Sequence, residues 1–265
     1  MKKATPGSAP AHPSVTFLLL ARQQQRWFWS LLALVLTGWT FLAWMVLDMG
    51  HPLVQLMMPM SARWSVPSAA AILVMWAIMM AAMMLPSALP MLLQFVDLAS
   101  RNGEAARGHA FVGAYLLVWL VFSMAATTLQ WCLQAAGWTD PMAASRSAWL
   151  TAALLLLAGI YQFSPLKQAC LARCRTPIGF LLGEWRPGAR GALVMGLRHG
   201  LFCLGCCWAL MALLFVGGVM DLAWVAALAI VVALEKLLPR GARLAVVMGL
   251  VLIGVGVFRL LELMR

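Results

Sequence analysis

The stretch ALVMGLRHGLFCLGCCWALMALLFV occupies residues 192–216 and is apolar apart from the adjacent pair Arg198 and His199. A helix needs about 20 apolar residues to cross a bilayer, within a range of roughly 17–25. The stretch has this length and composition, so it predicts a membrane-spanning helix. It also places His199 and three cysteines within a few residues of one another, inside the predicted span.

The composition of the whole chain is that of a membrane protein. Of its 265 residues, 64% are hydrophobic and 10% are charged, and the mean hydropathy is +0.91. Soluble domains average about 25% charged residues. Six further apolar stretches occupy residues 27–47, 67–95, 110–136, 148–163, 220–238 and 243–263. We therefore predict an all-α fold, a polytopic transmembrane helix bundle of about seven spans in the lipid bilayer, in which the short stretch 148–163 could instead be re-entrant.

The apolar stretches also define the domain organisation. We expect a disordered or interfacial tail over residues 1–26 and a single transmembrane helical domain over residues 27–265. The first apolar stretch is too long for a cleaved signal peptide, so we expect it to remain as an anchor. The inner loop at residues 164–191 is the only sizeable one and carries two cysteines.

The basic residues predict the orientation of the bundle. The chain has 19 Lys and Arg against 8 Asp and Glu, for a formal net charge of +11. With the N-terminus inside, fourteen of the 19 fall on the inner side and four on the outer side, while Arg198 lies inside a span. Because cytoplasmic loops are enriched in Lys and Arg, we predict an N-in/C-out topology in a bacterial inner membrane. The basic residues separate apolar runs and form no aromatic-interleaved patch, so we expect no nucleic-acid partner.

Five of the six cysteines lie within residues 170–207, toward the predicted cytoplasmic side. Structural disulfides are rare in that reducing compartment, so metal binding or redox chemistry is the better interpretation. On a helix of 100° per residue, Met195, Cys203 and Cys206 fall within about 40° of His199, and Cys207 lies beside them. Imidazole, thiolate and thioether groups are ligands of soft or borderline ions such as Cu(I) and Zn(II).

One helix cannot supply every ligand to one ion at good geometry. Cys170 and Cys174 are the best candidates to complete the site, because their i, i+4 spacing brings both sulfurs to one face of a helix. The alternative is that the cysteines are buried as small hydrophobic residues. His199 and Arg198 favour a functional site, since ionisable residues inside a span are costly.

Methionines form a second pattern. Eleven of the 19 lie between residues 45 and 91, and Met75, Met79 and Met83 follow MxxxM spacing, with Met80 and Met84 widening the same face. Thioethers bind Cu(I), so this face could relay a soft cation from an outer loop with His51, Met57, Met58 and Met60. Methionine is also a flexible core filler, and that alternative stays open here.

Two weaker features carry structural predictions. We interpret Glu235 and Lys236 as interface anchors at the inner end of a span, with an ion pair as the alternative. Gly249, Gly254 and Gly256 predict close packing of the last helix.

Three segments resemble a bacterial family of predicted metal-binding integral membrane proteins of unknown function, some of them labelled copper chaperones. They are MMAAMMLP, YQFSPLKQACLARCRTP and GLRHGLFCLGCCWALM, and the resemblance covers roughly residues 67–263. It implies metal binding through the residues of the last two motifs, namely Cys170, Cys174, His199, Cys203, Cys206 and Cys207.

We therefore predict a membrane protein that binds Cu(I), with Zn(II) as the alternative ion, and delivers or translocates it. Its partner would be a metallochaperone or a copper-dependent membrane enzyme. An intramembrane thiol-disulfide electron carrier using Cys203 and Cys206 is a rival hypothesis, as is a structural partner in a membrane enzyme complex. No P-loop, hydrolase elbow or HExxH motif is present, so the sequence assigns no enzyme class.

Overall fold

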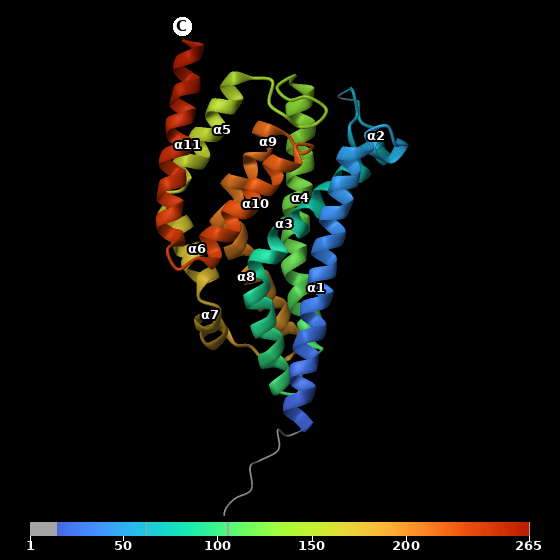
Figure 1. Ribbon diagram of the computed structural model, residues 1–265, viewed down its shortest axis with the longest axis vertical. Coiled ribbons are helices and arrows are strands. Elements are labelled where there is room, and N and C mark those ends of the chain that lie inside the picture. Colours follow the sequence, from blue (N-terminus) through green and yellow to red (C-terminus); the bar gives the residue numbers. More distant parts are fainter. Residues whose placement is uncertain (1–14, 62, 105, 265) are drawn as a thin grey trace, which may run out of the picture.

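The computed structural model describes residues 15–61, 63–104 and 106–264, and the regular elements within these ranges are all helices (Figure 1). They are α1 (Val15–Leu47), α2 (Pro52–Met57), α3 (Val66–Arg101), α4 (Arg107–Ala135), α5 (Ala148–Tyr161), α6 (Pro165–Arg175), α7 (Pro177–Glu184), α8 (Gly188–Ala212), α9 (Leu214–Gly217), α10 (Leu222–Leu237) and α11 (Gly241–Leu263). The predicted all-α fold is thereby confirmed.

The seven apolar stretches all form helices, but they differ in their ability to cross a membrane. Helices α1, α3, α4, α11 and the α8–α9 pair are long and apolar enough to do so. The short stretch forms α5, which turns by 64° into α6, so these two together make a bent sixth candidate. Helix α10 has 16 residues, just under the usual range. The structure thus supports a membrane bundle, while the seven-span count and the orientation remain predictions.

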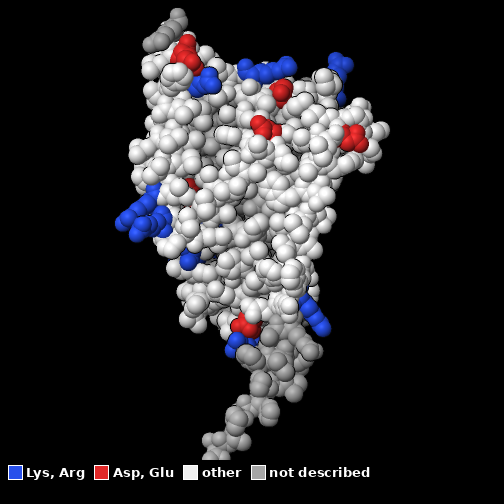
Figure 2. Space-filling view, in the orientation of Figure 1, with Lys and Arg blue, Asp and Glu red and all other residues white. Residues whose placement is uncertain are grey.

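The centre of the bundle is formed by α3, α4 and α8. Helix α4 packs against both of the others, and α10 lies against α3. Helix α1 covers the outer side of α3, while α11 lies along α5 at the opposite side of the molecule (Figure 1). Charged side chains gather near the ends and at one side of the face drawn in Figure 2, and the surface between is almost free of charge. This distribution suits a chain surrounded by lipid.

The predicted inner loop at residues 164–191 is largely helical. The Ser164 hydroxyl accepts a hydrogen bond from the backbone N–H of Leu166 at 3.2 Å and so caps α6, which begins with Pro165. Serine is a favoured N-cap, and proline has no N–H to leave unsatisfied at the first helical position. Pro177 likewise begins α7, although Thr176 before it makes no side-chain cap hydrogen bond. Cys170 and Cys174 therefore lie one turn apart on a helix that packs against α8.

The predicted tail falls partly outside the structure. Residues 15–26 form the first turns of α1, whereas residues 1–14 lie outside the described residues.

Candidate metal centre

The predicted stripe on α8 is buried inside the bundle. Its members are almost completely shielded from solvent and lipid: Met195, His199, Cys203, Cys206 and Cys207. Helix α8 packs closely against α4 because two of its glycines, Gly196 and Gly200, face α4. A Cβ at Gly200 would lie 2.8 Å from a methyl carbon of Val118, so the two backbones approach closely only because this residue is glycine.

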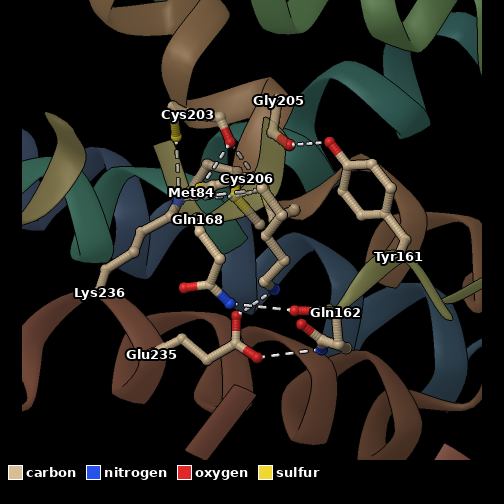
Figure 3. A network of polar contacts seen from close by, with 11 residues as sticks. Met84, Tyr161, Gln162, Gln168, Cys203, Gly205, Cys206, Glu235 and Lys236 are labelled. Atoms are coloured by element: carbon tan, nitrogen blue, oxygen red, sulfur yellow. Dashed lines mark hydrogen bonds and ion pairs between the residues drawn. The ribbon is translucent and has the colours of Figure 1, made fainter. Parts of the chain in front are cut away.

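A buried lysine lies among the sulfur atoms on one side of this stripe. The Lys236 Nζ atom of α10 lies 2.9 Å from Cys203 Sγ, 3.9 Å from Cys207 Sγ and 4.0 Å from Met84 Sδ (Figure 3). Cys207 Sγ is in turn 3.9 Å from Met84 Sδ. We call Met84, Cys203 and Cys207 the sulfur cluster. It joins α3 and α8 around the ammonium group of α10.

Two hydroxyl groups border the sulfur cluster. The Tyr115 hydroxyl of α4 lies 3.2 Å from Cys203 Sγ and 3.3 Å from the Met84 carbonyl oxygen. The Ser87 hydroxyl lies 3.3 Å from Lys236 Nζ and donates to the Met84 carbonyl oxygen. Four helices therefore contribute to one polar, sulfur-rich centre.

The α6 cysteines reach the other side of the α8 stripe. Cys174 of α6 lines a cavity together with Cys203 and His199 of α8. Cys170 packs so closely on Gly205 that a Cβ there would lie 2.7 Å from its sulfur atom. The Tyr161 hydroxyl donates to the Gly205 carbonyl oxygen at 2.5 Å (Figure 3). The structure thus places the two cysteine motifs at one helix contact, while their sharing of one metal site stays a prediction.

The interpretation of Glu235 and Lys236 as interface anchors is wrong. Both residues are buried, with exposed fractions of 1% and 5%. Glu235 forms an ion pair with buried Lys167 at 2.6 Å and accepts a hydrogen bond from Gln162 at 3.1 Å. Helix α10 is short and its end packs against α6, which removes these side chains from the membrane surface. Ionisable residues in an apolar stretch are costly to bury, and this is the sequence signal that could have predicted their interior position.

A small cavity opens beside the sulfur cluster. Its volume is about 150 Å³, and its lining includes Cys174, His199, Cys203, Lys236 and Ser87. His199 is 2% exposed, and neither of its ring nitrogens has a hydrogen-bond partner among the described residues. Its ring stacks near Tyr115, with the ring centroids 5.5 Å apart. A buried imidazole with both nitrogens free beside two thiols is available to bind a ligand in the cavity.

The predicted methionine face is buried in the bundle. Its three residues do not belong to the sulfur cluster, whereas the adjacent Met84 does. Met75, Met79 and Met83 lie in the core of the bundle. Met83 lines a separate apolar cavity with Trp39 and Pro86. Met84, which widens the predicted face, is the member of the sulfur cluster that α3 contributes, with its Sδ 3.9 Å from Cys207 Sγ.

The histidine of the predicted outer loop, His51, has a structural function. The His51 side chain accepts a hydrogen bond from the backbone N–H of Leu53 at 3.2 Å and caps α2, while Met60 is exposed.

Within the described part of the chain, no group of three or more His, Cys, Asp or Glu side chains is arranged as a ready metal site. The sulfur cluster differs from such a group in using a thioether together with two thiols.

The fold and this interior define a helical membrane protein with a buried cysteine, histidine and methionine centre. A family model described as a copper chaperone, PpoB2, matches residues 73–259, and the chain belongs to that family. This confirms the resemblance noted in the sequence. No curated protein and no solved structure matches the chain.

Proposed function

We propose that the protein binds Cu(I) at the sulfur cluster and passes it through the membrane interior. The observation that carries this proposal is the 3.9 Å separation of Cys207 Sγ and Met84 Sδ. Two sulfur ligands of one ion, with metal–sulfur bonds of about 2.3 Å and an angle near 120°, lie about 4 Å apart. Thiolate and thioether are the soft ligands that Cu(I) prefers.

The remaining candidate residues have supporting functions in this proposal. His199 and Cys174 line the cavity next to the cluster and would receive the ion as it arrives or leaves. Cys170 and Cys206 lie on the adjoining α6–α8 contact, and Met195 lies one turn before His199 on α8. The buried Met75, Met79 and Met83 would relay the ion along α3. Copper is the cargo here, delivered to a metallochaperone or a copper-dependent membrane enzyme.

A competition titration tests this proposal. The full chain, purified in detergent under reducing and anaerobic conditions, is titrated with Cu(I) against a chelator of known affinity. We expect the wild-type protein to compete for Cu(I), and the double variant Cys203→Ser/Cys207→Ser to lose at least tenfold in affinity. Cys132→Ser is the matched control, because that cysteine is exposed on α4.

Two outcomes would contradict the proposal. If the wild-type protein does not compete for Cu(I), the protein does not bind copper in this way. If the double variant binds as tightly as the wild type, the ion is held elsewhere.

A further inference from the structure

Lys236 is a buried positive charge with no carboxylate partner in the described structure. The neighbouring carboxylate, Glu235, is paired with Lys167 at 2.6 Å. The groups within 4 Å of the Lys236 ammonium are instead the sulfur cluster and the Ser87 hydroxyl. An uncompensated charge in a low-dielectric interior is costly, and the thiols of Cys203 and Cys207 are the acidic groups within 4 Å that can balance the ammonium as thiolates.

The charges of an occupied cluster can then be counted. Two thiolates, at Cys203 and Cys207, carry two negative charges, and the Met84 thioether is neutral. The Lys236 ammonium offsets one of the two. One negative charge is left, and a monovalent cation neutralises it. A divalent ion at the same position would leave a net positive charge buried in the bundle, which is unfavourable in a low dielectric.

The cavity gives the lysine room to remain while an ion enters. Lys236 and Ser87 both line it, so the flexible lysine side chain can withdraw from the sulfur atoms toward the Ser87 hydroxyl without leaving the centre. Its positive charge therefore acts on the ion in the occupied state as well.

We infer that Lys236 makes the sulfur cluster selective for monovalent soft cations, Cu(I) and Ag(I), over divalent ions such as Zn(II). This inference rests on the proposed function and adds the property by which the site recognises its cargo. Thiolates alone bind Zn(II) well, so the sulfur ligands by themselves do not provide this discrimination.

The test compares Cu(I) and Zn(II) affinities of the full chain in detergent. Lys236→Gln removes the positive charge. Ser87→Asp leaves the lysine in place but sets a carboxylate next to its ammonium group, which lies 3.3 Å from the present hydroxyl. We expect both variants to lower the ratio of Cu(I) to Zn(II) affinity by roughly tenfold or more, chiefly by gaining Zn(II) binding. Ser87→Asn is the matched neutral control and should keep the wild-type ratio.

The outcomes separate this inference from the proposed function. Wild-type protein that fails to bind Cu(I) contradicts the proposed function itself. Wild-type protein that binds Cu(I), together with a folded Lys236→Gln or Ser87→Asp variant of unchanged ratio, overturns the inference alone. Should both variants fail to fold, the wild-type protein still decides: Zn(II) bound as tightly as Cu(I), and lost in Cys203→Ser/Cys207→Ser, would also overturn it.

Discussion

His199 is the buried polar side chain of this centre with the fewest hydrogen bonds. Both ring nitrogens lack hydrogen-bond partners among the described residues, although aromatic rings surround the imidazole. An unsatisfied buried polar group costs about 1–3 kcal/mol of stability. Such a cost is typical of a site built for a ligand and not for packing.

The replacement His199→Phe distinguishes a role of His199 in ligand binding from a role in packing. Phenylalanine keeps an aromatic ring among Phe111, Tyr115 and Phe180 but removes the unsatisfied nitrogens. We expect the metal-free variant to be as stable as the wild type or more stable by about 1 kcal/mol. Its Cu(I) affinity should fall at least severalfold. Thermal unfolding followed by circular dichroism and the chelator competition measure the two effects. A clear loss of metal-free stability would show that the imidazole supports the fold.

At the scale of elements, the contact between α6 and α8 brings the two cysteine motifs together. Gly205 permits this contact because Cys170 occupies the space that a Cβ would need. Helix α8 continues without a break through Gly205, so the glycine serves close packing between helices. The same is true of Gly249 and Gly256 where α11 meets α5, but Gly254 has no neighbouring atom within 4 Å. The predicted packing role is therefore correct for two of those three glycines.

Gly205→Ala tests the importance of the α6–α8 contact. The added methyl group would lie 2.7 Å from Cys170 Sγ, so α6 must shift away from α8. We expect a loss of about 1–3 kcal/mol in stability, as for other overpacked interiors, and weaker Cu(I) binding. Gly254→Ala is the control: with open space around it, the substitution should leave Cu(I) binding unchanged and raise stability by at most about 1 kcal/mol through helix propensity. Equal effects of the two substitutions on copper binding would exclude a specific contribution of the α6–α8 contact.

For the whole molecule, the arrangement of helices bears on the number of membrane crossings. The beginning of α1 and the end of α11 lie at opposite ends of the bundle (Figure 1). An odd number of crossings produces this arrangement. The predicted number, seven, is reached when the bent α5–α6 pair and the short α10 are added to the five long candidate spans.

Reporter fusions in a bacterial inner membrane test this topology. A reporter at the C-terminus should be active outside the cytoplasm, while one placed between α7 and α8 should be active inside, because basic residues concentrate near that segment. A cytoplasmic C-terminus would mean an even number of crossings, with the bent α5–α6 pair then re-entrant.

Hydropathy and helical periodicity were sufficient to predict the long apolar helices and the buried face of α8, but not the short helices α2, α6 and α7, which lie in predicted loops. Both are local properties, because the bilayer length and the 3.6-residue repeat act within a single segment. The i, i+4 spacing of Cys170 and Cys174 likewise requires only that α6 be a helix.

The identity of the groups that meet in the centre was decided by tertiary packing alone. Periodicity places Met83 and Met84 on adjoining sides of α3, but only the packing of α8 and α10 selects Met84 as the neighbour of Cys207. Lys236 has the sequence context of an interface anchor and is buried only because the end of α10 packs against α6 and α8. A sequence pattern specifies which side of a helix is apolar, whereas the charge and ligand partners of a buried side chain depend on helices far away in the chain.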